Sequence, residues 1–202
     1  MFELGTSADQ FNTDYPCLMN NKDRSVLSAL VQKLPSNSIL VEIGSKLGGS
    51  AKLMHDYMSH DSTLYCVDVD WSYPDQMIDL EDISIKHFNT VYNLSCFQTT
   101  FDFAKNYLKN CSNIKLMPAD SPGELSWWKW PVDFVFEDSS HHNPQLHKNL
   151  NFWIKKLKSG GIMAGHDYTG EFLDVMSEAD KLAKVLSTEL YIDGTIWWII
   201  KP

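Results

Sequence analysis

An α/β fold is the class that the sequence predicts, with a doubly wound, mostly parallel β-sheet between two layers of helices. Three observations support it: short buried strands alternate with helical patterns, a glycine-rich turn joins the first strand to a helix, and the chain ends in a hairpin pattern. The 202 residues, 44% of them hydrophobic, are enough for one core. We therefore expect a single domain over residues 1–202, made of an N-terminal segment and helix (1–35) and a core (36–202).

Five runs of apolar, β-branched or aromatic residues, each bounded by turn residues, predict the strands of the parallel part of the sheet. Near the C-terminus, Asp193-Gly194 separates two β-rich runs, 189–192 and 195–200, and this dipeptide is typical of a hairpin. An antiparallel hairpin closing a parallel sheet is unusual among nucleotide-binding folds. The five predicted strands are Ser38–Ile43, Thr63–Val67, Ile114–Met117, Val132–Phe136 and the shorter Ile162–Ala164.

Between these runs, apolar residues recur at helical spacing. The first predicted helix ends before Pro35, and the clearest one follows Pro144 and stops at Ser159-Gly160-Gly161. The segment from Trp71 to Asn110 is long for one crossover, and we expect it to carry part of a substrate pocket. Its two helix-like stretches are Ile83–Tyr92 and Thr100–Leu108.

Charge and cysteine content exclude several kinds of partner. The net charge is −9 and Arg24 is the only arginine, so we expect neither a basic face nor the guanidinium forks typical of phosphate binding, and no nucleic-acid partner. No stretch has the pattern of a signal peptide or the ~18 apolar residues of a membrane span. The four cysteines are widely spaced, which indicates free thiols in a reducing compartment and predicts a cytoplasmic protein without a membrane partner. An oligomer is compatible with the sequence, which leaves that question open.

The first predicted strand runs into a glycine turn and then into an apparent helix from Ala51. Glycines let the backbone turn tightly and come close to a ligand, and the amides at a helix N-terminus can bind an anionic group. A dinucleotide-binding turn would have glycine where Lys46 stands, which disfavours NAD. A purely structural turn is the alternative interpretation. The predicted cofactor-binding residues of this turn are Glu42, Gly44, Ser45, Gly48, Gly49 and Ser50.

Polar side chains follow the next predicted strands. Asp68 ends the second strand, where such a fold places an acid that accepts hydrogen bonds from ribose hydroxyls, and Asp70 is a second candidate. Asp120-Ser121 follows the third strand and Asp138 the fourth. Because ligands bind at this edge of such sheets, we predict that Asp68, Asp120, Ser121 and Asp138 contact the cofactor. A helix cap ahead of Pro122 is the alternative role of Asp120.

At this point the residues resemble class I S-adenosylmethionine-dependent methyltransferases, specifically methyltransferase family 24, a group similar to macrocin O-methyltransferase and cephalosporin hydroxylase-like proteins. The resemblance covers Ile39 to Pro202. Its most specific parts are Val132–His141 and Lys158–Tyr168. The family pattern at the fourth strand is like Phe-Ile-Asp-Gly-Asp-His, and this sequence has Phe-Glu-Asp-Ser-Ser-His. Asp138 and His141 match this pattern, whereas Ser140 replaces an acid.

The resemblance implies a seven-stranded sheet with an antiparallel C-terminal strand and S-adenosylmethionine as the cofactor. It also implies O-methylation of a hydroxyl on a small molecule such as a sugar, a glycoside or a related metabolite. Two alternatives stay open: an NAD-type oxidoreductase, and a non-catalytic nucleotide- or cofactor-binding domain, which Ser140 supports. Trp127, Trp128 and Trp130 follow the Asp120-Ser121 turn, where one indole could border the adenine, and core packing or a surface lid is the expected role of at least two of them.

The acceptor side of the predicted site depends on two acids. Asp138 and Asp167 are expected at the ends of neighbouring strands ~4.8 Å apart. Two carboxylates so placed repel each other unless a cation lies between them, and a divalent ion such as Mg²⁺ suits that position. Such an ion would polarise a substrate hydroxyl and lower its pKa. The alternative is that one acid is protonated or hydrogen-bonded to the backbone.

Histidines gather at the same edge. His141, His142 and His166 follow the fourth and fifth strands, and a histidine there could act as the general base, with or without a metal. His141 is preferred because it matches the family position. The predicted catalytic patch is therefore His141, Asp138 and Asp167, with Asp138 and Asp167 as the metal ligands.

Overall fold

Seven strands form one sheet in the residues that the structure describes, 14–72, 78–80 and 83–202. In this computed structural model the strand order is β3-β2-β1-β4-β5-β7-β6. The first five strands are mutually parallel, and β7 runs antiparallel to both β5 and β6. The predicted fold class and the C-terminal hairpin are confirmed. The strands are β1 Ile39–Ile43, β2 Thr63–Asp68, β3 Ile114–Pro118, β4 Val132–Glu137, β5 Leu157–Gly165, β6 Leu190–Asp193 and β7 Ile196–Ile200.

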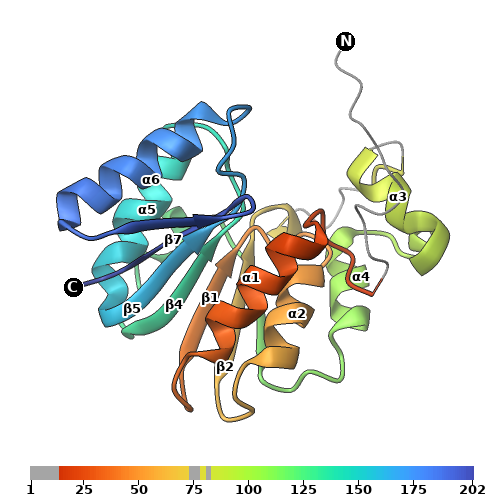
Figure 1. Ribbon diagram of the computed structural model, residues 1–202. Helices are drawn as coiled ribbons and strands as arrows, with labels where there is room; N and C mark the ends of the chain where they lie inside the picture. Colours follow the sequence, from red (N-terminus) through yellow and green to blue (C-terminus); the bar gives the residue numbers. More distant parts are fainter. Residues whose placement is uncertain (1–13, 73–77, 81–82) are drawn as a thin grey trace.

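Helices cover both faces of the sheet (Figure 1). Helices α1, α2 and α4 pack on one face, and α5 and α6 pack on the other. Helix α3 packs against α4, through Phe88 and Phe103, beside the sheet. No helix in the described part of the chain has the length and apolar character needed to cross a bilayer. The helices are α1 Asn21–Gln32, α2 Gly49–Tyr57, α3 Ile83–Tyr92, α4 Thr100–Tyr107, α5 Gln145–Lys156 and α6 Leu173–Leu186.

The central strands bury side chains on both faces, which explains their continuous apolar runs. Along β4, Phe134 and Phe136 point to the face of α1 and α2, while Val135 points to the face of α5 and α6. This alternation follows from the two-residue period of a strand. The same period sends Glu42 of β1 and Glu137 of β4, both buried, towards opposite faces.

Two parts of the sequence interpretation were wrong. The residues Ser159-Gly160-Gly161 do not lie between a helix and a strand, because β5 already begins at Leu157. Gly160 takes φ +76°, and its N–H donates to the carbonyl of Lys201, so the C-terminal residues extend the pairing of β5. Helix α6 was not predicted, although Val175, Ala179 and Leu182 bury one face at helical spacing.

Candidate active site

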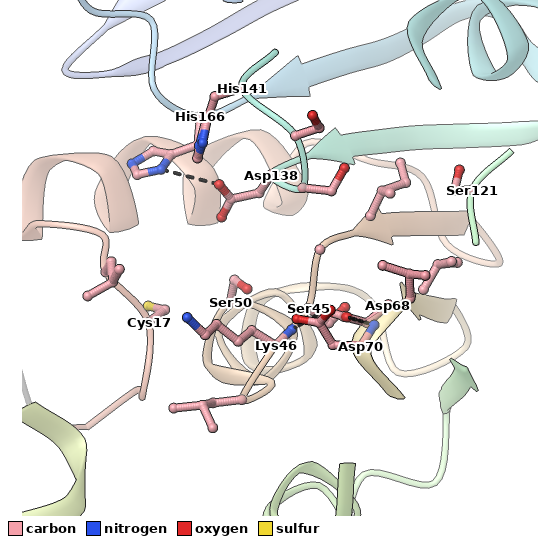
Figure 2. A pocket seen from close by; sticks show the side chains of 18 of the residues that line it. Cys17, Ser45, Lys46, Ser50, Asp68, Asp70, Ser121, Asp138, His141 and His166 are labelled. Carbon is pink, nitrogen blue, oxygen red and sulfur yellow. Dashed lines mark hydrogen bonds and ion pairs between the residues drawn. The ribbon is translucent and has the colours of Figure 1, made fainter. Parts of the chain in front are cut away.

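A cavity of about 530 Å³ opens at the carboxyl ends of β1, β2, β4 and β5, within the size range of small-molecule sites. Figure 2 shows Lys46 and Asp68 on one side of it and Asp138 on the other. Phe88 of α3 also lines it, so residues 71–110 contribute to a pocket as expected. Most predicted site residues line this cavity, namely Gly44, Ser45, Ser50, Asp68, Asp120, Ser121, Asp138, His141 and Asp167, whereas Glu42, Gly48 and Gly49 do not.

The glycines of this turn are needed because neighbouring backbone segments pack closely against them. Gly44 has φ +92°, and a Cβ there would lie 2.3 Å from the carbonyl oxygen of Asp138. At Gly49 a Cβ would meet the carbonyl group of Pro16 at 2.4–2.5 Å. Glycine is therefore needed to bring the ends of β1 and β4 together and to seat the segment before α1 on the start of α2. Helix α2 begins at Gly49, two residues earlier than predicted.

Glu42 lies under the turn and has no exposed surface. Its Oε2 accepts a hydrogen bond of 2.5 Å from the Ser45 hydroxyl, while Oε1 has no partner. Burial raises the pKa of Glu42 to about 7, against the opposing effect of the Ser45 hydroxyl. This carboxyl group supports the turn from below and has no access to the cavity.

Asp68, at the end of β2, links the turn to the following loop. One carboxylate oxygen accepts from the backbone N–H of Lys46 at 2.6 Å and the other from the N–H of Asp70 at 2.9 Å. Burial raises the pKa of Asp68 to about 6, although the Lys46 N–H opposes this shift. Asp70 lines the same cavity and is exposed. Both acids are therefore placed for a ligand, and Asp68 is the one that the backbone orients.

The Asp120-Ser121 turn forms the next part of the wall. Ser121 Oγ accepts a hydrogen bond of 2.9 Å from Trp153 Nε1, and the Ser121 carbonyl accepts from Gln145. The carbonyl of Asp120, not its side chain, receives the N–H of Glu124 at the start of the following 3₁₀ turn. Trp128 packs in the core against Trp153, whereas Trp127 and Trp130 are exposed, and the cavity wall contains none of the three. The structure thus supports core packing for Trp128 rather than a place beside the adenine.

The ends of β4 and β5 bring the predicted catalytic patch together. His141 Nε2 lies 2.7 Å from Asp167 Oδ2, and the His141 ring stacks on Phe172 with centroids 4.2 Å apart. His166 Nδ1 lies 3.4 Å from Asp138 Oδ1 and 3.3 Å from Asp167 Oδ2. His142 is exposed and does not line the cavity. The two acids and two of the three predicted histidines therefore form one cluster.

A buried imidazolium balances the acids of this cluster. Burial alone would lower the pKa of His166, but Asp138, Asp167 and Asp23 outweigh it and raise that pKa to about 12. For Asp167, burial is overcome by His141 and His166, which hold the pKa of this carboxyl well below its usual range. The hydrogen bond to Asp167 raises the pKa of His141. The proximity of Asp138 and Asp167 predicted a cation between them, and His166 supplies at least part of this positive charge.

The cluster can also hold a metal ion. Asp138, His141 and Asp167 each offer a ligand atom, and these atoms lie within 4.8 Å of one another. The second oxygen of each carboxylate, Asp138 Oδ2 and Asp167 Oδ1, has no partner among the described residues. Free carboxylate oxygens are the hard ligands that Mg²⁺ or a similar divalent ion takes, so Asp138 and Asp167 fit the predicted metal, whereas the His141 imidazole is a poorer ligand for Mg²⁺ and stays available as a base.

Sequence reasoning missed Asp23, the residue behind this cluster. Asp23 lies in α1 with 1% of its surface exposed, accepts the N–H of Thr195 at 2.8 Å and stands 3.5 Å from His166 Nε2. Its partners are about 140 and 170 positions away in the sequence, so no local pattern could reveal the contact. An acid in the first turn of a helix normally indicates only a favourable interaction with the helix dipole.

Comparison with known proteins identifies the family. Residues 41–168 match the family model described as a methyltransferase domain, methyltransferase family 24, so the chain belongs to this family. Its fold is that of the class I methyltransferases. A search of curated protein sequences gives no significant match.

Solved structures share this fold at low sequence identity. Precorrin-6y C5,15-methyltransferase from Geobacter metallireducens is 15% identical, with a TM-score of 0.62 over 97% of this chain and 96% of that one. An O-methyltransferase from Bacillus cereus, in complex with SAH, is 14% identical, with a TM-score of 0.59 over 96% of this chain and 86% of that one. A SAM-dependent O-methyltransferase from Thermotoga maritima is 12% identical, with a TM-score of 0.59 over 91% and 66%.

Proposed function

We propose that this protein is an S-adenosylmethionine-dependent O-methyltransferase that acts on a hydroxyl group of a small molecule. The observation that carries the proposal is the composition of one cavity. A glycine turn and the Asp68 carboxylate line one side, and the Asp138, His141 and Asp167 cluster lines the other. A methyl donor and an acceptor hydroxyl bound on these two sides would lie next to each other, which is the main requirement for an in-line displacement.

The cofactor side fits S-adenosylmethionine, which supplies an electrophilic methyl group when bound. Gly44, Ser45 and Ser50 would hold its amino-acid portion, and Asp68 would accept hydrogen bonds from the ribose hydroxyls. Asp120 and Ser121 lie where the cavity continues past β3 and would contact the base. Lys46 takes φ +44°, and its backbone N–H donates to Asp68. Because Lys46 stands where a dinucleotide site has its second glycine, the turn does not match such a site.

The acceptor side would activate the hydroxyl group. Asp138 and Asp167 would hold a divalent ion such as Mg²⁺ through their free oxygens, and the ion would lower the pKa of a bound hydroxyl. His141, fixed by Asp167 and Phe172, would accept the proton. The family resemblance favours a sugar, a glycoside or a related metabolite as the acceptor, and neither nucleic acid nor a membrane is proposed as a partner.

The state of the cysteines supports a proposal for the cellular compartment. All four cysteines, Cys17, Cys66, Cys96 and Cys111, are free thiols, and Cys66 and Cys111 are buried. Thiols without disulfides are typical of a reducing environment. We propose the cytoplasm as the site of action.

Calorimetric titration with S-adenosylmethionine, S-adenosylhomocysteine and NAD⁺ tests the cofactor. We expect both adenosyl compounds to bind and NAD⁺ not to bind. A Gly44→Val variant should lose binding, because its side chain would push against the Asp138 backbone and displace the cavity wall. Tighter binding of NAD⁺ would overturn the proposal in favour of an oxidoreductase.

A panel of sugar and glycoside acceptors, assayed for release of S-adenosylhomocysteine, tests the transfer. With a competent acceptor, chelator should abolish turnover, Mg²⁺ should restore it, and Asp167→Asn should remove both activity and metal dependence. Loss of activity in His141→Ala without any effect of chelator would assign the base role to His141 and overturn the metal. Cofactor binding without turnover on any acceptor would favour a non-catalytic binding domain.

A further inference from the structure

Helix α5 carries a positively charged surface on a chain whose net charge is −9. No aspartate or glutamate occurs between Ser139 and His166, and α5 bears Lys148, Lys155 and Lys156. Lys148 and Lys155 are exposed, whereas Lys156 is half-buried. The expectation from composition that the protein has no basic face is therefore wrong for this helix.

The lysines on this surface are not neutralised by acids. The nearby basic side chains that do have acidic partners are Lys158, whose Nζ lies 2.7 Å from Asp133, and His147, whose Nδ1 lies 2.6 Å from Glu178. Lys148 and Lys155 have no acidic partner among the described residues. Lys156 donates to the carbonyl of Trp128 at 2.7 Å and lies over the Phe152 ring, so its charge also stays uncompensated.

A groove and two exposed indoles accompany these charges. The groove has a volume of about 420 Å³, and its wall includes Asn151 and Phe152 together with the three lysines. Trp127 and Trp130, on either side of Trp128 in the sequence, are 50% and 54% exposed, with ring centroids 6.0 Å apart and an interplanar angle of 82°. The Lys156 contact to Trp128, and the hydrogen bond from Trp128 Nε1 to the Trp130 carbonyl, join the indoles to α5. Exposed aromatic side chains beside uncompensated charges are typical of a binding surface.

We propose that this basic-aromatic face, made of Trp127, Trp130, Lys148, Phe152, Lys155 and Lys156, binds an acidic oligosaccharide. The flat indole faces can pack against the apolar C–H faces of sugar rings, while the lysines pair with carboxylates and Asn151 offers an amide to hydroxyl groups. Lys148 and Lys155 are seven residues apart, which separates them by about 10 Å along the helix. This wide spacing suits a chain in which acidic sugars alternate with neutral ones.

Other partners match the surface less well. A two-fold dimer through this face would place lysines against lysines, which is unfavourable. Nucleic acid carries a charge about every 3.4 Å along each strand, which is much denser than the spacing of about 10 Å between Lys148 and Lys155. The single arginine is buried in α1 rather than present on this face. The proposal does not depend on the identity of the methyl acceptor, because the cavity of the active site is a separate one.

The test uses a hyaluronan octasaccharide, in which a carboxylate occurs on every second sugar, titrated into the full-length protein by calorimetry and by indole fluorescence. We expect binding that weakens at least tenfold in the Lys148→Ala/Lys155→Ala double variant and in the Trp127→Ala/Trp130→Ala double variant. A matched control, Lys105→Ala/Lys109→Ala, removes two exposed lysines at α4 and should leave the affinity unchanged. Circular dichroism and the thermal midpoint verify that every variant is folded.

Several results would overturn the proposal. These are the absence of octasaccharide binding, equal affinity in the wild-type and both double variants, and equally tight binding of a neutral cello-oligosaccharide. Tighter binding of single-stranded RNA, or of an acidic peptide with the same number of charges, would also overturn it by assigning the face to another class of partner. None of these results bears on cofactor binding in the cavity, which is measured separately.

Discussion

The two sides of the active-site cavity place acids at strand ends in opposite electrostatic surroundings. On the side of β1 and β2, Glu42 and Asp68 accept hydrogen bonds only from neutral hydroxyl and amide groups, and burial raises their pKa values to about 7 and about 6. On the side of β4 and β5, Asp167 faces two imidazoles, and its pKa is lowered. The neighbours of each carboxyl group, rather than its position on the sheet, determine its charge.

This difference divides the chemistry of the site. The acids of the cofactor side are shaped for hydrogen bonding and support, because a carboxyl with a raised pKa carries its proton more readily. On the acceptor side, Asp167 stays ionised, because its pKa is lowered, and it can attract a cation or orient an imidazole. A buried histidine, His166, joins the acceptor side to α1 through Asp23.

Removal of His166 should have the largest effect. His166→Ala leaves Asp23, Asp138 and Asp167 without their shared cation, so we expect the free energy of unfolding to fall by about 3–5 kcal/mol, as for a broken buried ion pair. Urea denaturation monitored by circular dichroism measures this loss. The surface pair of Lys22 with Asp193 provides the control, since Lys22→Ala should cost less than about 1 kcal/mol. Similar losses in the two variants would contradict the role of His166.

Glu42→Gln should remove a pH dependence that belongs to the cofactor side. The pKa of Glu42 is about 7 in the folded protein and 4.5 in a free side chain, so the folded state binds the proton more tightly between these values. The stability that this residue contributes is therefore full below pH 4.5 and is lost as the pH rises to about 7. We expect the wild type to lose about 1–3 kcal/mol more than Glu42→Gln between pH 5 and pH 7.5.

Urea denaturation at the two pH values checks this expectation. Glu137, whose pKa burial also raises to about 7, contributes in the same direction and remains in the variant, so part of the decline should persist. The Gln side chain keeps an oxygen that can accept the Ser45 hydroxyl, which limits the change to the titration itself. A pH profile identical to that of the wild type would show that Glu42 is ionised throughout.

The two acids after β2 should differ in their effect on cofactor binding. Asp68→Ala should weaken S-adenosylhomocysteine by about 1–3 kcal/mol, because it removes the acceptor that the Lys46 and Asp70 amides orient. Asp70→Ala, at an exposed position, should change the affinity little. Calorimetry on both variants makes the comparison. Unchanged affinity in Asp68→Ala, with a loss in Asp70→Ala, would move the ribose contact to Asp70.

The sequence predicted the site residues that local patterns reveal, and it missed those that depend on contacts between distant parts of the chain. Gly44, Asp68, Asp138 and Asp167 stand at strand ends, and the alternation of strands with helices was enough to bring them to one edge. The sequence could not show that His166 lies between the acids, because that depends on the side-chain rotamer. Asp23 was invisible, because its contacts join α1 to the loop after β5 and to the β6–β7 hairpin. The basic face of α5 was hidden by an overall composition that is acidic.

The smallest predicted effect concerns Ser140, which stands where the family has an acid, and it tests directly whether the acceptor side binds a metal ion. Ser140 donates to the carbonyl of His142 and lies two residues beyond Asp138, so Ser140→Asp would add a third carboxylate near Asp138 and Asp167. Affinity for hard divalent ions rises with the number of charged oxygen ligands, and we expect Mg²⁺ to bind about tenfold more tightly, a gain of about 1.4 kcal/mol. Calorimetric titration of Mg²⁺ into the protein with S-adenosylhomocysteine present measures it. Ser126→Asp, at an exposed position, adds the same charge elsewhere and is the matched control. An equal gain in Mg²⁺ affinity in both variants would show that net charge alone causes it. No Mg²⁺ binding in either variant would mean that His166 and His141 already balance the charges of Asp138 and Asp167.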